Sequence, residues 1–537
     1  MDPAYKMHSK EASAGANLAQ VTSVRPDLEG AAAHVQGDEA QLKLRFSVFS
    51  MAFLCIVVLS TPAAWAGSVA TALLAGGPVC MFFGFLVVFV CSLCGAASLA
   101  EMVSIWPTAE GQIAWTEHLA PPSCSRFLRY YVAWLTAIAW IFMTSSATFI
   151  CAVSITGIAS LCHPTYVPER WHTALMFWAI LVIGLFLNIY GMRLFSYLNN
   201  VIAFSMLGST VAIVAILFAK SSGDYNSAHY AFLGFENGTG WSSRGITFIV
   251  GMVSAAFSIL GYDSVAHMCE EMYKPAVYAP RAMVGSVLIS LPAGLLIILA
   301  FVFTIKDIPT IATQIFPLTY ILEQALGNKA GAAFLTVTMS TTSAACASMS
   351  MLATSGRVIW SFALEGGIPF SRQLSKINRQ HHVPIRAMVV SVIIQCLIVL
   401  IYIGNAALFN SILVLAIALL NASYLIPNFL MLTRGRRSGT LPKAPFSLGP
   451  VLGPVCNVVA IIYELFISVM LFLPTVRPVT GENMNYACAI FGVAHIICGV
   501  YWFFGGRKRA HNYATDRAAA VAAAASNDTG SVKGAAA

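Results

Sequence analysis

The chain is dominated by apolar runs that are long enough to cross a lipid bilayer. A membrane-spanning helix needs about 20 apolar residues, and only helices or closed barrels can satisfy their backbone polar groups inside lipid. Only 10% of the residues are charged, against ~25% in an average soluble domain. The pattern predicts an all-α polytopic membrane protein with twelve spans, at 46–76, 78–103, 126–161, 171–191, 194–219, 245–272, 282–304, 331–364, 385–404, 406–432, 452–473 and 486–504.

The basic residues predict the orientation of these spans. With the N-terminus inside, 24 of the 30 Lys and Arg residues fall on the inner side and 6 on the outer side. Cytosolic loops are enriched in Lys and Arg, so we expect both termini in the cytosol. Residues 1–45 and 505–537 are polar or alanine-rich and are expected to be disordered cytosolic tails. The sequon at Asn237 then lies in an outer loop, where a glycan could be attached.

Two of the spans are interrupted in the middle. The run 245–260 stops at Gly261, Tyr262 and Asp263. Glycine within a helix costs roughly 1 kcal/mol relative to alanine, and an acid at membrane depth costs ~2.5 kcal/mol or more. The first span is similarly interrupted at 60–67, where Pro62 cannot donate a backbone hydrogen bond. Such breaks in lipid are tolerated where the backbone lines a cavity, so they indicate a site.

The interrupted spans are five apart, which predicts an inverted repeat. Because five is odd, repeats at 46–219 and 245–432 would have opposite orientations, and the binding site of such transporters lies near the midplane. The last two spans, 452–504, fall outside the repeat. We therefore expect a 5+5 inverted-repeat transporter domain over 46–504, with broken first and sixth helices.

Several segments resemble the fungal amino acid/choline transporter family of the amino acid-polyamine-organocation superfamily. They are GSVATALLAGGP, SLAEMVSIWPTAEGQIAWTEHLAPP, GYDSVAHMCEEMYKP and PVTGENMNYA. The resemblance covers roughly residues 45–505. It implies secondary transport of an amino acid, GABA, choline or a similar amine, driven by protons, at the fungal plasma membrane. It also leaves open a relative that carries a small amine or alkaloid made by a biosynthetic cluster.

The two breaks supply the candidate binding site. If both are real, the backbone N–H groups that open the second half-helices, at 65–67 and 263–264, present partial positive charge to a solute carboxylate. The alternative in the first span is a proline kink capped by Ser60 or Thr61. The candidate substrate-binding residues are Thr61, Ala64, Trp65, Ala66, Gly67, Phe257, Gly261, Tyr262, Asp263 and Ser264.

Asp263 is the most informative single residue. It could be the counter-ion of a solute ammonium or a proton-coupling carboxyl, or it could cap the half-helix that begins near Ser264. His267 lies one turn later, so the two side chains could share a proton, although a packing histidine is the commoner outcome. Trp65 and Tyr262 could hold a cation through cation–π contacts, whereas Trp140 and Phe257 are favoured as core residues.

Coupling and gating residues are predicted more loosely. The resemblance implies a proton as the coupling ion. Thr341 and Thr342 could instead offer oxygens to sodium, or act as interhelical hydrogen-bond partners. Glu101, Glu270 and Glu271 could form an inner gate by pairing with Arg357, Lys274 or Arg281, or could simply be solvated charges.

The sequence argues against other classes of protein. There is no basic stripe with interleaved aromatics for nucleic acid, and the cysteines show no metal or disulfide spacing. A membrane enzyme would gather His and acidic residues on one face, which the loops do not do. We therefore expect a transporter that binds a small solute and carries no cofactor or metal.

Overall fold

The structure is a computed structural model that describes residues 47–378, 380–405, 407–439, 441–481 and 483–506. Within them, the regular elements are helices, apart from one β-bridge between Ala75 and Asn237. In this described part of the chain, ten helices are long and apolar enough to cross a membrane. The predicted tail 1–45, and the tail 505–537 from residue 507 onward, lie outside the described residues.

The first predicted repeat begins with a helix pair on either side of Ser60. Its elements are α3 (Val48–Leu59), α4 (Thr61–Leu74), α5 (Gly77–Val79), η1 (Cys80–Gly84), α6 (Phe85–Ile105), α7 (Gln112–Leu119), α8 (Ser125–Cys162), α9 (Arg170–Tyr190) and α10 (Met192–Lys220). A short outer helix, α11 (Ala228–Leu233), follows.

The second predicted repeat has corresponding pieces. They are α12 (Arg244–Ser258), α13 (Ser264–His267), η2 (Cys269–Glu271), α14 (Pro275–Thr304), α15 (Ile308–Thr313), α16 (Pro317–Leu326), α17 (Lys329–Thr336), η3 (Val337–Thr341), α18 (Thr342–Leu364), α19 (Ser371–Leu374), α20 (Ile385–Gly404) and α21 (Leu408–Leu430). The last elements of the described residues are η4 (Met431–Gly435), α22 (Arg436–Ser438), α23 (Gly449–Met470), α24 (Ala487–Tyr501) and η5 (Trp502–Gly506).

The all-α membrane architecture is confirmed, but the number of spans is not settled at twelve. The two predicted spans that are missing from the ten long apolar helices are 245–272 and 331–364. The first is interrupted between Ser258 and Ser264, and the second is rich in serine, threonine and alanine. The count of twelve therefore stays a prediction.

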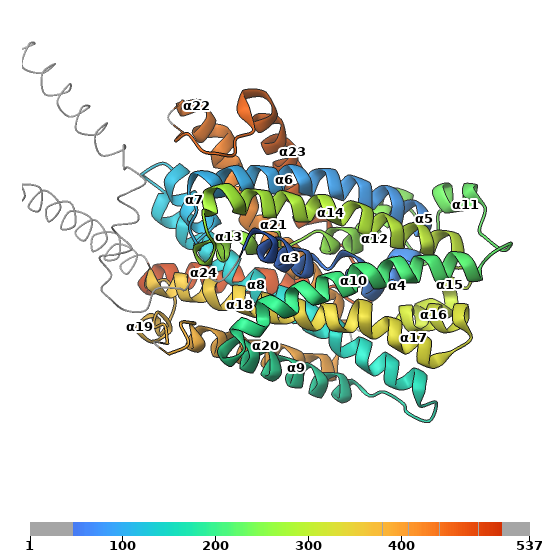
Figure 1. The fold of residues 1–537 in the computed structure, drawn as a ribbon. Coiled ribbons are helices and arrows are strands. Elements are labelled where there is room, and N and C mark those ends of the chain that lie inside the picture. The colour runs from blue at the N-terminus through green and yellow to red at the C-terminus, as the bar shows by residue number, and fades with distance from the viewer. Residues whose placement is uncertain (1–46, 379, 406, 440, 482, 507–537) are drawn as a thin grey trace, which may run out of the picture.

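Equivalent helices of the two predicted repeats pack against each other. The contacts pair α4 with α12, α6 with α14, and α8 with α18, while α23 packs on α6 and α21. Figure 1 shows the long helices running side by side, with α7, α19 and α22 at one end of the bundle and α11, α15 and α16 at the other. Such pairing is what a pseudo-two-fold axis between inverted repeats would produce.

Both predicted breaks are present, but the first is narrower than the predicted interruption at 60–67. It consists of Ser60 alone, which is left-handed with φ 41° and ψ 41°, and α4 starts again at Thr61. Pro62 sits in the first turn of α4, where its missing N–H costs nothing, so it starts a helix instead of ending one. The prediction that the N–H groups at 65–67 are open is therefore wrong, because these residues lie inside α4.

The second break is wider. The residues 259–263 between α12 and α13 are not helical, and Gly261 has a φ of 91°. A side chain at Gly261 would meet Val58, Met143 and Trp140 at 3.2–3.5 Å. Glycine is therefore required here both by the backbone conformation and by the close packing of α3 and α8.

Candidate functional site

Asp263 is the centre of a closed polar cluster in the wide break. Its side chain is 0% exposed. Gln112 Nε2 donates to its Oδ2 at 2.8 Å, Trp140 Nε1 donates to the same oxygen at 3.2 Å, and the Tyr424 hydroxyl donates to Oδ1 at 2.5 Å. The carboxyl does not cap α13, so the capping interpretation is wrong. These three donors come from α7, α8 and α21, so the carboxyl lies where several helices converge, as expected of a residue in a binding site.

His267 and Asp263 share a proton. His267 Nδ1 lies 2.9 Å from the backbone oxygen of Ala109, and a carbonyl can only accept, so Nδ1 carries a hydrogen. His267 Nε2 lies 3.2 Å from Asp263 Oδ2. A contact at this distance requires a hydrogen on one of the two atoms. The pair therefore holds one proton, either on the imidazole or on the carboxyl.

Aromatic rings surround this pair. The rings of Tyr262 and Tyr424 are 5.2 Å apart, and the Trp140 ring meets the His267 ring edge-on at 6.0 Å. Tyr262 and Asp263 both point into the bundle, as their burial shows. Trp65, in contrast, is buried against Phe85 of α6 at 5.9 Å. The structure thus brings Trp140 to the carboxyl although the sequence favoured a core role for it.

The two breaks meet directly. The Thr61 hydroxyl, at the start of α4, donates to the backbone oxygen of Ser258 at the end of α12, at 2.8 Å. Ser254 donates to the backbone oxygen of Ser68 at 3.1 Å. The Ser264 N–H donates to the Gly261 oxygen at 3.1 Å. The prediction that this amide is free to bind a solute is therefore wrong. The Thr61 side chain, at the N-terminus of α4, therefore links the two breaks.

The segment 108–112, between α6 and α7, covers Asp263 on the side predicted to be cytosolic. Besides accepting from His267, Ala109 donates its N–H to Glu270 Oε1 at 2.9 Å. A side chain on Gly111, which has a φ of 55°, would lie 3.0 Å from the His267 ring. The backbone of the segment therefore packs directly against the site, and a solute could leave on the side predicted to be cytosolic only if the segment moved.

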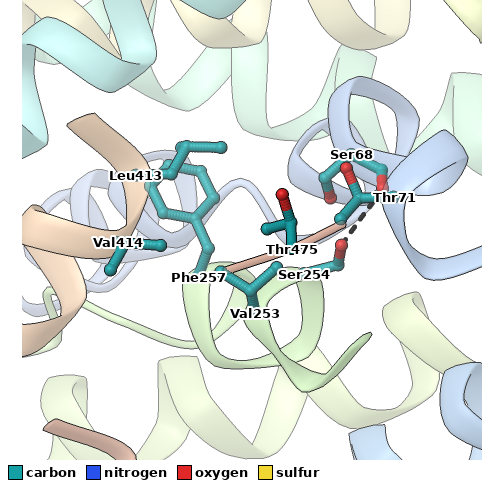
Figure 2. Close-up of a pocket in the computed structure, with 8 residues that line it drawn as sticks. All are labelled: Ser68, Thr71, Val253, Ser254, Phe257, Leu413, Val414 and Thr475. Carbon is teal, nitrogen blue, oxygen red and sulfur yellow. Dashed lines mark hydrogen bonds between the residues drawn. The ribbon is translucent and has the colours of Figure 1, made fainter. Parts of the chain in front are cut away.

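A narrow cleft lies between α4, α12 and α21. Its lining includes Ser68, Phe257 and Leu413, and its free volume is about 10 Å³, room for roughly one water molecule. Figure 2 shows the Phe257 ring extending between Leu413 and Val414. With Asp263 fully buried, the site is closed on this side as well.

The predicted gate acids form specific ion pairs. Glu271 pairs with Arg357, whose Nε donates at 2.7 Å. Glu101 pairs with Arg436, which is none of the predicted partners. A second inner cluster joins Arg129 to Glu110 at 2.9 Å, to Glu365 at 2.8 Å and to Glu117. Since Glu110 belongs to the covering segment, this cluster fastens that segment to α8 and α18.

The remaining predicted residues are spread over other contacts. Thr341 accepts from Ser154 at 3.0 Å, and Thr342 donates to the Thr338 oxygen at 3.2 Å. Gly67 abuts Ile150, and Ala64 accepts from Ser68 at 2.7 Å. Asn237 is exposed and accepts from Thr239 at 2.8 Å. Among the described residues, no group of three His, Cys, Asp or Glu side chains is placed to hold a metal.

Two members of the cluster were not found from the sequence. Gln112 lies in one of the segments that resemble the transporter family, but a single glutamine beside a loop gives no signal of its own. Tyr424 reads as one aromatic residue in an apolar span. Only the packing of α7 and α21 around the wide break brings them to Asp263.

Two broken helices that meet beside a buried carboxyl, closed on both sides, define a solute transporter. A model of the amino acid permease family matches residues 45–494. The choline transporter of Saccharomyces cerevisiae is 32% identical over 90% of this chain and 85% of its own length. A putative amino acid/polyamine transporter of Macrophomina phaseolina is 31% identical over 80% of this chain and 95% of its own.

The chain therefore belongs to the amino acid permease family. A swainsonine transporter of Arthroderma benhamiae is also similar, with 28% identity over 81% of this chain and 86% of its own length. The family and these relatives are transporters, so the protein is a membrane transporter and not an enzyme.

Proposed function

We propose that the protein moves a small solute with a positively charged nitrogen, such as a choline-like amine or an amino acid, across the plasma membrane together with a proton. The observation that carries the proposal is the buried Asp263 carboxyl at the wide break, with an aromatic side chain on two sides of it. An uncompensated charge at this depth is costly, which a cationic solute would relieve.

The surrounding groups fit such a solute. Cation–π contacts with desolvated rings are each worth ~2 kcal/mol, and they are how proteins recognise quaternary ammonium groups. Trp140 and Tyr424 contact Asp263, and the Tyr262 ring lies tilted against the Tyr424 ring at 5.2 Å. Gln112 Oε1 is buried without a hydrogen-bond partner and lies on the amide that contacts Asp263. It could accept from a solute hydroxyl or ammonium.

Transport would proceed by alternating access. In this structure the site is closed by the segment 108–112 on one side and by the Phe257 cleft on the other. Opening toward the cytosol requires release of Glu110 from Arg129 and of Ala109 from Glu270. Opening outward requires Phe257 to leave Leu413 and Val414. These two sets of contacts share no residue, so each side could open without the other.

The uptake of radiolabelled choline, GABA and proline in a permease-deficient yeast, with and without a protonophore, tests the proposal. We expect one of the three to accumulate, and we expect the protonophore to abolish accumulation. A fluorescent fusion should appear at the cell periphery. Surface protein that accumulates none of the three would contradict the proposed solute class, and accumulation that resists the protonophore would contradict proton coupling.

A second candidate is a small alkaloid or amine of a biosynthetic cluster, which the similarity to a swainsonine transporter favours. A solute with an amine nitrogen would also carry a positive charge, so Asp263 suits it equally. The two candidates separate by competition. An excess of unlabelled swainsonine should leave choline uptake unchanged if the first proposal holds, whereas uptake of an alkaloid with no uptake of choline or amino acids would favour the second.

A further inference from the structure

A second acid lies deep in the bundle, behind the wide break. Glu464 is near the middle of α23, within the apolar run AIIYELFISVM, and its side chain is 1% exposed. No described residue forms an ion pair with it, and its Oε2 has no hydrogen-bond partner. An acid at membrane depth is costly and commonly marks a proton or ion pathway.

A one-way chain of hydrogen bonds ends at the other oxygen of Glu464. The chain starts at Arg436, which has only donors, and its Nε donates to Asn457 Oδ1 at 2.6 Å. Asn457 Nδ2 donates to Ser98 at 2.6 Å, Ser98 donates to Asn428 Oδ1 at 2.6 Å, and Asn428 Nδ2 donates to Glu464 Oε1 at 2.7 Å. The arginine fixes every orientation, so Oε1 is an acceptor.

The chain also fixes where a proton can sit. Since Oε1 accepts from Asn428, a proton on Glu464 must lie on the unpartnered Oε2. Burial opposes the charged form of the acid, whereas a donor chain polarised by a guanidinium favours it. A group under these opposing influences can change its protonation state when its surroundings move, as a coupling site requires.

Glu464 faces the wide break across Gly95 of α6. A side chain on Gly95 would lie 3.4 Å from Glu464 Oε1 and 2.8 Å from the Tyr262 hydroxyl, so both groups converge where α6 has no side chain. The Tyr262 ring in turn contacts the ring of Tyr424, whose hydroxyl donates to Asp263. The other titratable groups facing this region are Cys91 and Cys94 of α6 and Tyr463 of α23.

We propose that Glu464 is the binding site of the transported proton, separate from the counter-ion Asp263. The inference rests on the proposed function, because a proton and a cationic solute cannot both occupy Asp263. The cationic solute replaces the proton that Asp263 shares with His267, and this proton returns to the side from which the solute came. A proton carried in the same direction as the solute is therefore assigned to a second carboxyl. Glu464 takes up a proton on Oε2 to become a neutral acid and releases it on the other side.

Reconstituted vesicles with a pH gradient test the assignment. Glu464→Gln mimics the protonated acid. We expect it to lose gradient-driven accumulation of the labelled solute, down to the level of wild-type vesicles with a protonophore, and to lose solute-dependent proton uptake measured with a pH-sensitive dye. Exchange of labelled for unlabelled solute without a gradient should stay within about threefold of wild type, since no net proton movement is needed. Asp307→Asn, an exposed cap residue of α15, is the matched control.

A wild-type measurement covers the case in which the glutamine variant does not fold. A hydrophobic carbodiimide reacts with protonated carboxyls in apolar surroundings. The acid proton passes to the carbodiimide nitrogen, and the carboxyl oxygen bonds to its carbon. Mass spectrometry should find the adduct on Glu464, with less of it as the pH rises and less when the solute and a pH gradient drive turnover. No adduct on Glu464 between roughly pH 5 and 9 would overturn the assignment.

The failures are distinguishable. If wild-type vesicles move solute and protons together and Glu464→Gln does so at the same ratio, the assignment of Glu464 is wrong and proton coupling stands. If wild-type vesicles accumulate solute with no proton movement, proton coupling itself is wrong, and the role of Glu464 falls with it.

Discussion

Both broken helices are interrupted at a residue with positive φ, but the side chains at the two breaks are very different. The first break is one left-handed residue, Ser60, and the helix resumes at once. The second is five residues long, contains the left-handed Gly261, and carries Tyr262 and Asp263. Gln112, Trp140 and Tyr424 donate to Asp263, and His267 shares a proton with it. None of these four residues belongs to the first broken helix.

The difference indicates a division of labour between the breaks. The narrow break ends α3 and begins α4 so that Thr61 can bond to Ser258, and it supplies position and a helix N-terminus. The wide break supplies the charge, the proton and the aromatic surface. An inverted repeat therefore provides a symmetric frame, and function depends on the half in which acidic and aromatic residues were placed.

The largest expected effect is at the wide break. Asp263→Asn removes the charge and keeps the shape, so we expect the protein to reach the membrane but uptake to fall on the order of 100-fold or more, since truncating one member of a buried charged pair costs ~3–5 kcal/mol. Radiolabelled uptake normalised to surface protein measures this. Uptake within twofold of wild type would show that the wide break does not hold the solute.

Gly261→Ala tests the backbone of the same break. A φ of 91° is strained for alanine, and the added methyl would press on Val58, Met143 and Trp140. Strain of this kind costs about 1–3 kcal/mol, so we expect uptake to fall about tenfold at equal surface expression. An unchanged uptake rate would mean that the break relaxes freely and that its shape is not part of the site.

Ser60→Gly is the matched change at the narrow break. Ser60 is also left-handed, and its strain of about 1–2 kcal/mol would be relieved by glycine, with an offsetting loss of roughly 0.5–1 kcal/mol from chain entropy. We expect uptake within about twofold of wild type and a melting temperature within a few degrees. A loss of uptake as large as that of Gly261→Ala would erase the distinction between the breaks.

Ten of the twelve predicted spans correspond to long apolar helices of the described residues, and both breaks are present. These features could be predicted from the sequence because apolar length and interruption are local properties. The span expected at 126–161 is α8, Ser125–Cys162, and the span expected at 385–404 is α20, Ile385–Gly404. The predicted extent of the first break was wrong, because residues 61–67 are helical. A proline can either end or begin a helix, and the sequence does not show which occurs. Here the left-handed conformation of Ser60 ends α3, and Pro62 lies in the first turn of α4.

The site was predicted in part. The break at 261–263 could be recognised because a glycine and an acid are costly in a membrane helix. The sequence does not point to Gln112, Trp140 and Tyr424, because only packing between distant helices brings them to the site. Glu464 had the same local signal as Asp263, an acid in an apolar span. It lies outside the predicted repeats, however, so the breaks do not point to it.

The segment 108–112 covers the wide break and is held by the ion pairs of Arg129. A substitution in this cluster gives the smallest expected effect. Glu365, at the inner end of α18, shares Arg129 with Glu110 and Glu117. Burial raises the pKa of Glu365 to about 8, with Arg129 lowering it and the two neighbouring acids raising it. The folded protein thus holds this proton more tightly than the unfolded chain does. The resulting stability is complete at low pH and is lost as the pH rises through about 8.

We therefore expect the melting temperature of purified protein to fall between roughly pH 5 and 9, and Glu365→Gln, which is neutral throughout, to lessen that fall by a few degrees. Scanning fluorimetry across this range measures it, with Asp307→Asn as the exposed control. An equal slope in Glu365→Gln and wild type would mean that Glu365 is ionised in the folded protein. All three acids around Arg129 would then be ionised. The segment 108–112 would be held by charged ion pairs, with no proton bound in the cluster.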